Sequence, residues 1–253
     1  MHKRLALLIA ASVLSPAAFA ADWTGWYVGA DVGHANGDSR ARVALGDSWL
    51  TESTSLQTHV TDQWSNDLSP SGSAYGLHVG YNHEFESGFM LGGEFEYGNL
   101  NLDDRKVIAG ASNPYSVGEG SLSYDTTNRI EANRQYSLRA KVGYANGPHF
   151  GYLTAGPTRV DADLTAEILS TGDYHKRASK SENLSGIQWG LGYEYGFNPH
   201  WTGRIEYLRS DLGKVHYDTA YVAGSSFTDP VYSERFSQDL EFDTVRIGVN
   251  YRF

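Results

Sequence analysis

The sequence predicts an all-β protein: an eight-stranded antiparallel up-and-down transmembrane β-barrel. Three observations lead to this fold class. Eight segments alternate apolar and polar residues with a period of two, and each, at about nine to fifteen residues, is long enough to cross a bilayer at a tilt. The connections between the segments are alternately long and short. The polar faces of the segments are rich in glycine, which is unusual for strands that face water.

The chain begins with the three regions of a secretory leader. Residues 1–4 are basic at Lys3 and Arg4, residues 5–14 are apolar, and Ala18-Phe19-Ala20 is a small-x-small cleavage site. The apolar stretch is too short to span a membrane. We therefore predict that residues 1–20 are a cleaved signal peptide and that residues 21–253 form the barrel.

Composition excludes several classes of protein. The chain has no cysteine, so an exported form must be held together by backbone pairing and burial rather than by disulfides. The formal charge of −10 becomes −12 when Lys3 and Arg4 are removed, which argues against a nucleic-acid partner. No apolar run after the leader reaches the length of a membrane helix, so a helical membrane protein is excluded.

Turn chemistry places the strand ends. Short turns are predicted at Glu86-Ser87-Gly88, Asn146-Gly147-Pro148 and Asn198-Pro199. The predicted strands cover residues 24–34, 73–85, 88–99, 134–146, 149–161, 185–197, 200–211 and 241–253. Four long polar segments are expected to be extracellular loops at the opposite end of the barrel, at about 35–72, 100–133, 162–184 and 212–240.

Aromatic residues recur at nearly one height above the short turns. Strands that run towards this end finish in Val79-Gly80-Tyr81, Val142-Gly143-Tyr144, Leu191-Gly192-Tyr193 and Val249-Asn250-Tyr251. Aromatic residues favour strands in general, but propensity does not set a common height. The pattern is typical of an aromatic girdle at the periplasmic membrane interface. The predicted girdle comprises Trp26, Tyr81, Phe89, Tyr144, Tyr193 and Trp201, and Phe150 has the equivalent place on its strand.

The two faces of each strand predict which side meets lipid. Leu77, Leu91 and Val249 belong to the apolar, lipid-facing set, whereas the opposite faces carry glycine and charges of both signs. The interior of an eight-stranded barrel is only just wide enough for side chains, which explains the glycines. Strand 149–161 alternates poorly, and its faces are not assigned.

The charges of the polar faces are expected to form a belt of ion pairs in the lumen. Unpaired charges in so confined a space would be costly. The predicted belt comprises Asp31, Glu94, Glu96, Arg139, Lys141, Glu194, Arg204, Glu206 and Arg246, and Arg252 adds a further positive charge. The belt is either a plug that ties the strands together or a gate along a narrow ion path. The plug is favoured because a barrel of this size has no room for an aqueous channel.

Catalytic and metal-binding motifs are absent from the sequence. It contains no glycine-rich phosphate loop, no Gly-x-Ser-x-Gly and no His-Glu-x-x-His. No strand carries Ser and His two residues apart on one face, although His59, His175 or His216 could meet a serine in the loops. We therefore expect no enzyme activity, no cofactor and no metal.

The expected loops contain aromatic and aliphatic side chains among polar residues. They are Trp49, Leu50, Leu56 and Trp64 in the first segment and Tyr217, Tyr221, Phe227 and Tyr232 in the fourth. Such residues could anchor a partner, or they could extend the barrel wall as short hairpins. The two possibilities have similar weight.

At its two ends the chain resembles the small outer-membrane barrel family, which includes the transmembrane domain of outer-membrane protein A and opacity-type porin-family surface proteins. Residues 23–29, Trp-Thr-Gly-Trp-Tyr-Val-Gly, are similar to the opening strand, and residues 249–253, Val-Asn-Tyr-Arg-Phe, are similar to the C-terminal assembly motif. The resemblance implies that both termini are periplasmic and that the barrel-assembly machinery recognises Tyr251 and Phe253. Members of the family differ in function, so the fold alone does not choose one.

These observations together lead us to expect a non-enzymatic outer-membrane barrel that contributes to envelope structure and surface contact. Its expected partners are outer-membrane lipid and lipopolysaccharide, the barrel-assembly machinery, and host or environmental ligands of the loops. The alternatives are a narrow porin-like channel or a lipid-modifying enzyme, and then a soluble barrel of the lipocalin type.

Overall fold

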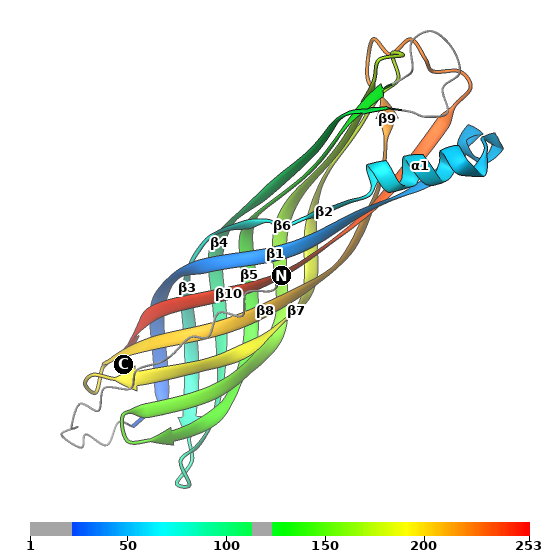
Figure 1. Ribbon diagram of the computed structural model, residues 1–253. Helices are drawn as coiled ribbons and strands as arrows, with labels where there is room; N and C mark the ends of the chain where they lie inside the picture. Colours follow the sequence, from blue (N-terminus) through cyan, green and yellow to red (C-terminus); the bar gives the residue numbers. More distant parts are fainter. Residues whose placement is uncertain (1–21, 113–122) are drawn as a thin grey trace, which may run out of the picture.

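A single antiparallel sheet closes into a ring of eight strands, as the sequence predicts (Figure 1). The computed structural model describes residues 22–112 and 123–253, so the predicted signal peptide at residues 1–20 lies outside the described residues. The ring strands are β1 (Gly25–Asp47), β3 (Ser71–Glu84), β4 (Phe89–Ser112), β5 (Ser123–Asn146), β6 (His149–Ser170), β7 (His175–Gly196), β8 (Trp201–Asp218) and β10 (Tyr232–Arg252). No helix in the described part of the chain is long and apolar enough to cross a membrane.

Smaller elements accompany the ring. The helices η1 (Ser48–Thr51) and α1 (Thr54–Trp64) and the short strand β2 (Asn66–Leu68) connect β1 to β3, and β9 (Ala220–Tyr221) lies between β8 and β10. Helix α1 begins after Ser53, whose side chain accepts a hydrogen bond from the backbone N–H of Leu56, as an N-cap does.

The first and last strands close the barrel. Strand β1 pairs with β10 from Tyr27 and Arg252 to Asp47 and Tyr232. The short turns after β3, β5 and β7 lie at one end, which we call the short-turn end, and the C-terminus lies there too (Figure 1). Gly88 and Gly147 have positive φ angles in these turns, a conformation that suits glycine.

The four predicted long loops were wrong in extent. Seven of the ring strands run past the predicted limits, so that residues 35–47, 100–112, 123–133, 162–170, 175–184, 212–218 and 232–240 are strand. Alternation persists there but is hard to see in the sequence. The inward positions are often alanine, such as Ala35, Ala132 and Ala166, while the outward positions are the polar residues expected of loops. The part of the expected second loop at residues 113–122 lies outside the described residues.

Beyond the middle of the molecule the wall divides into two arms. Pairing of β7 with β8 stops at Gly186 and Leu212, although β6 and β7 stay paired as far as Leu169 and His175. Pairing of β1 with β3 stops at Asn36 and Ser71. The first arm therefore consists of the far halves of β4–β7, and the second arm consists of the far halves of β8, β10 and β1.

The arms enclose a hydrophobic core. Their inward side chains form one buried cluster, which Trp49, Val60, Trp64 and Leu68 of the β1–β3 connection join. On one side β2 pairs with β1, and on the other side β9 pairs with Lys176 and Arg177 of β7. The far end is thus a packed structure, because its strands bury apolar surface on their facing sides as a sheet sandwich does.

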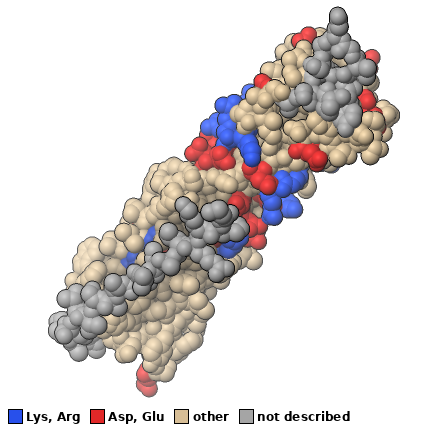
Figure 2. All heavy atoms as spheres, in the orientation of Figure 1, with Lys and Arg blue, Asp and Glu red and all other residues tan. Residues whose placement is uncertain are grey.

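The outer surface of the short-turn half is apolar. Its exposed side chains include Leu77, Leu91, Leu153, Ile187, Ile247 and Val249. Tyr75, Tyr97, Tyr136 and Trp189 are exposed near the edge of this band that faces the arms. Ion pairs follow immediately, for example Arg134 with Asp161 at 2.9 Å and Arg209 with Glu241 at 2.7 Å. Figure 2 shows these charges gathered at the waist of the molecule.

Candidate functional site

The nine predicted belt residues meet in the lumen of the short-turn half. On one side of the belt, Arg246 Nη2 donates to Glu96 Oε2 at 2.7 Å and to Glu206 Oε2 at 2.5 Å, while Arg246 Nη1 lies 3.2 Å from Asp31 Oδ1. Arg139 donates to Glu94 and to Glu96, the latter at 2.8 Å. Neighbouring strands supply two of these contacts directly, because Glu94 is paired with Arg139 and Glu206 with Arg246 in the sheet register.

Other belt contacts span the lumen. Arg204 Nη1 lies 2.8 Å from Glu94 Oε2, and Arg204 Nη2 lies 2.8 Å from Asp31 Oδ2. Lys141 Nζ lies 2.9 Å from Glu194 Oε1 of β7 and also 3.2 Å from Glu94 Oε2 of the neighbouring strand β4. Every belt cation has at least two carboxylate partners, so removal of one acid leaves several buried charges without compensation.

The belt also contains uncharged partners that the sequence analysis did not identify. The hydroxyl of Tyr27 donates to Glu94 at 2.8 Å, that of Tyr152 donates to Glu206 at 2.7 Å, and Gln188 accepts from Arg139 at 2.6 Å. Tyr27 could have been identified from the sequence, because the alternation of its strand puts it on the same face as Asp31. Tyr152 could not be identified in this way, because it lies on the strand 149–161, whose faces were not assigned. The inward face of this strand carries aromatic residues instead of small polar ones.

His78 and Asn250 complete the network on the β1 side. His78 Nδ1 lies 3.1 Å from Asp31 Oδ2, and its Nε2 lies 2.7 Å from Asn250 Oδ1. Asn250 in turn donates to Glu194 at 2.9 Å. The residues of the belt are thus tied to one another from all sides of the lumen.

Two glycines make space for the belt tyrosines. A Cβ atom on Gly80 would lie 2.3 Å from the Tyr27 hydroxyl oxygen, and one on Gly192 would lie 2.3 Å from the ring of Tyr152. No real side chain tolerates such a contact without a shift of its neighbours. The glycines of the polar faces therefore have the steric role that the sequence indicated.

Two predicted positions differ in the structure. Phe150 does not join the outer girdle but is buried at the short-turn mouth against Trp23, with ring centroids 5.3 Å apart. Arg252 does not join the belt; its guanidinium lies over the Trp23 ring at 4.6 Å and donates to the Asp22 carbonyl. The alternation of β6 and β10 turns both side chains inward, and Trp23 of the segment before β1 packs against them at this mouth.

The remaining predicted residues lie on the outer surface near the short-turn end. Trp26, Tyr81, Phe89, Tyr144, Tyr193 and Trp201 are all exposed there. Tyr251 packs against Trp201 with ring centroids 5.2 Å apart and against Phe253 at 5.4 Å. The backbone N–H of Phe253 donates to Trp26 at 3.1 Å, which fixes the end of the chain to β1 while the ring stays exposed.

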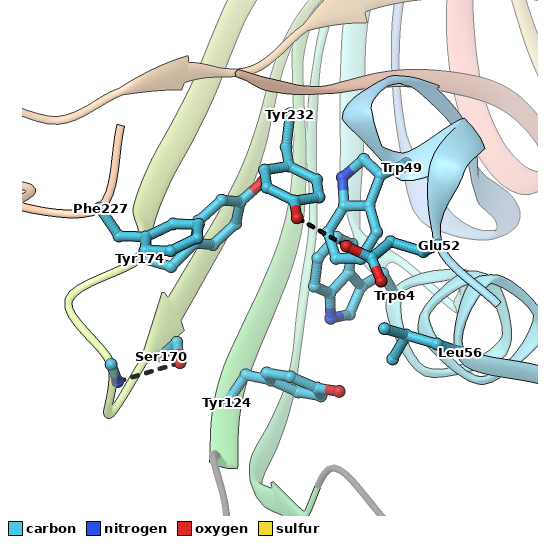
Figure 3. Close-up of a pocket in the computed structure, with 10 residues that line it drawn as sticks. Trp49, Glu52, Leu56, Trp64, Tyr124, Ser170, Tyr174, Phe227 and Tyr232 are labelled. Carbon is cyan, nitrogen blue, oxygen red and sulfur yellow. Dashed lines mark hydrogen bonds between the residues drawn. The ribbon is translucent and has the colours of Figure 1, made fainter. Parts of the chain in front are cut away.

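An aromatic pocket lies at the far end, where the two arms meet (Figure 3). Its volume is about 210 Å³, and its walls come from η1 and α1, from the β6–β7 turn and from strands of both arms. The residues that line it include Trp49, Glu52, Leu56, Trp64, Tyr124, Tyr174, Phe227 and Tyr232. Several of these were expected either to anchor a partner or to extend the barrel wall as short hairpins. In the structure Trp49 and Trp64 are buried in the far core, and Leu56 and Tyr232 pack against it.

A second buried ion pair fixes two aromatic residues of the pocket wall. Lys176 Nζ lies 2.7 Å from Glu234 Oε2, and the Trp49 indole donates to Glu234 Oε1 at 2.6 Å. Tyr174 donates its hydroxyl to the same carboxylate. Burial, together with the charge of Glu234, raises the pKa of Tyr174 far above the ordinary value for tyrosine, so this hydroxyl stays protonated and remains a donor.

Metal coordination has no support among residues 22–112 and 123–253, where no three His, Asp or Glu side chains are grouped to hold an ion.

A closed antiparallel ring with an apolar outside and an ionic inside defines the class of outer-membrane β-barrels. The family described as "outer membrane protein beta-barrel domain" matches residues 5–253, and the chain belongs to this family. It is 26% identical to the 31 kDa outer-membrane immunogenic protein of Brucella melitensis biotype 1 over 91% of this chain and 84% of that protein.

Two further similarities agree with this assignment. The 25 kDa outer-membrane immunogenic protein of Brucella abortus biovar 1 is 24% identical over 72% of this chain and 78% of its own length. Among solved structures, the outer membrane protease OmpT from Escherichia coli aligns with a TM-score of 0.52 and 10% identity, covering 90% of this chain and 97% of that one. At this identity the likeness concerns the fold alone.

Proposed function

We propose that this outer-membrane barrel is a structural and surface-contact protein of the envelope whose lumen is closed by the ionic belt. The observation that carries the proposal is the density of the belt. Four cations and five carboxylates fill one level of the lumen, and the cavity beside Asp31, Glu96, Gln188 and Arg246 has a volume of only about 10 Å³. That is about the space of a single water molecule, too little for a hydrated ion.

The orientation follows from the same proposal. The short-turn end, with both ends of the barrel domain, faces the periplasm, and the two arms project from the cell. The ion pairs at the waist would then lie at the level of the lipopolysaccharide headgroups, and the exposed aromatic residues below them would lie at the outer interface. The barrel-assembly machinery would recognise Tyr251 and Phe253, and the arms would contact host or environmental ligands.

The proposed role is non-enzymatic. A Ser-His-acid arrangement needs a serine hydroxyl at the histidine ring. His175 Nε2 lies 2.8 Å from Glu167, but the nearby Ser225 hydroxyl donates to the backbone carbonyl of His175 and not to its ring. His78 is held between Asp31 and Asn250 inside the belt. These contacts support a structural role for both histidines.

Planar-bilayer conductance tests the closed lumen. The purified protein should give no stepwise current above the background of the lipid alone. The variant Glu94→Ala, which removes a shared partner of Arg139, Lys141 and Arg204, should introduce openings if it stays folded. Regular single-channel steps from the unaltered protein would contradict a closed lumen and would favour the narrow pore.

A further inference from the structure

We propose that the aromatic pocket between the two arms is a binding site for a small, neutral, single-ring aromatic molecule that carries an oxygen hydrogen-bond acceptor. This assignment goes beyond the envelope role, and it does not depend on whether the lumen conducts.

Two unpaired buried donors carry the proposal. The indole N–H of Trp64 and the hydroxyl of Tyr124 are buried, and neither has a hydrogen-bond partner in the described part of the chain. Both side chains line the pocket, and Figure 3 shows their polar atoms on its inner side, facing the space beside Leu56. Leaving a buried donor unpaired is costly, whereas a ligand oxygen in this space could accept from both groups.

The walls of the pocket select a flat ring. Trp49 and Trp64 meet edge to face at 5.5 Å and 82°, and Trp64 meets Tyr124 at 5.8 Å and 80°. Edge-to-face contacts between wall residues leave ring faces free to stack on a guest. A volume of about 210 Å³ suits one substituted ring, because an apolar cavity of about 150 Å³ is known to hold benzene.

The pocket is held in shape without a ligand. Trp49 is fixed by its hydrogen bond to Glu234, Glu52 accepts from the Tyr232 hydroxyl at 2.7 Å, and Asn128 of β5 donates to the carbonyl of Trp64 at 3.3 Å. A pre-formed site avoids the entropic cost of ordering its walls when the ligand binds.

Other ligand classes fit less well. Glu52 is the only charged residue of the described lining, so an anion would be repelled. A cation would leave the two donors of Trp64 and Tyr124 unpaired. A sugar would bury several hydroxyls in a site that is mostly aromatic, and those without a partner would cost free energy.

The test uses the full-length protein in lipid nanodiscs, with empty nanodiscs of the same lipid as the blank. Binding of 4-fluoroacetophenone, followed by ¹⁹F relaxation, should be saturable and about tenfold or more tighter than that of fluorobenzene, which has the ring but no oxygen acceptor. The anion 4-fluorobenzoate should also bind more weakly than the ketone. Equal affinity for the ketone and fluorobenzene, or no saturable binding of the ketone, would overturn the proposal.

Conservative variants locate the site. Trp64→Phe and Tyr124→Phe should each weaken ketone binding about fivefold, because each removes one donor and keeps the ring. Trp189→Phe, a matched change on the outer surface, should leave the affinity unchanged. If neither pocket variant differs from Trp189→Phe, the site is not this pocket. Should both variants fail to fold, the three-ligand comparison on the unaltered protein decides alone.

Discussion

Arg204 Nη1 lies 2.8 Å from Glu94 Oε2, although the two residues belong to β8 and β4, which are not neighbours in the barrel. The contact crosses the lumen and is almost completely buried on both sides. Glu94 also contacts Arg139 and Lys141 of β5, so a single carboxylate compensates three cations from two strands. Glu94 is therefore a position at which the stability of the lumen depends strongly on one side chain.

Replacement of Glu94 with alanine should lower the free energy of unfolding by about 3–5 kcal/mol, because three buried cations lose a partner. Urea unfolding of the protein from lipid vesicles, followed by tryptophan fluorescence, measures this change. Arg235→Ala is the matched control, since it breaks an exposed pair with Asp218 at 2.7 Å and should cost less than about 1 kcal/mol. A similar decrease in the free energy of unfolding for both variants would show that the buried ion pairs of Glu94 stabilise the protein no more than an exposed pair.

Steric filling of the lumen can be tested at glycines of different surroundings. Gly192→Ala should destabilise the barrel by about 1–3 kcal/mol, because the new methyl group would collide with the Tyr152 ring. Gly151→Ala, on the outer side of β6 with open space around it, should change stability by less than about 0.5 kcal/mol. The same unfolding assay compares them, and an equal effect at both positions would show that the lumen is not tightly packed there.

Alkaline pH should loosen the far end selectively. Burial raises the pKa of Tyr124 to about 12, above its usual value near 10. A raised pKa in the folded state means that the stabilisation is complete below pH 10 and is lost as the pH rises towards 12. Because the pKa of Tyr232 is also raised to about 12, the absorbance change at 295 nm near pH 12 should decrease by the amplitude of one tyrosine in Tyr124→Phe. If Tyr124→Phe instead loses absorbance that titrates near pH 10, Tyr124 is exposed to solvent.

Removal of Phe253 should impair membrane assembly but not export. The ring is exposed and makes its contact with Tyr251, so its loss leaves the barrel interior unchanged. The truncated chain should accumulate as an unfolded periplasmic form without the heat-dependent gel shift of a folded barrel. Phe227→Ala, an exposed phenylalanine at the far end, serves as the control and should assemble as usual. Normal insertion of the truncated chain would disprove the assembly role.

The strand count, the tight turns and the ionic belt were predictable because each depends on a local pattern. Period-two alternation and the Asn-Gly and Asn-Pro turns are visible in the sequence, and adjacent strands place Glu94 beside Arg139. The division into two arms was not predictable, since it depends on where the pairing of β7 with β8 stops at Gly186 and Leu212. No residue pattern marks that point.

The aromatic pocket at the far end could not be predicted from the sequence either. Trp49 and Trp64 stood out as aromatic residues in a polar segment, but their packing depends on Glu234, which lies 185 residues after Trp49 along the chain. The covered mouth beside Phe150 likewise needs Trp23, from a segment that was expected only to open the first strand. Contacts of this kind arise from barrel closure and have no local sequence pattern.

In the short-turn half, the apolar face of every strand should contact lipid while glycine and charge fill the interior. Spin labels at Leu77, Leu91 and Val249, each introduced as a single cysteine in a chain that has none, test it directly. In bilayers they should collide with oxygen and be shielded from a water-soluble nickel complex, whereas a label at Arg177 of the first arm should meet the nickel complex. Labels at the three apolar positions that report water, or the immobility of a packed core, would contradict the orientation of every strand.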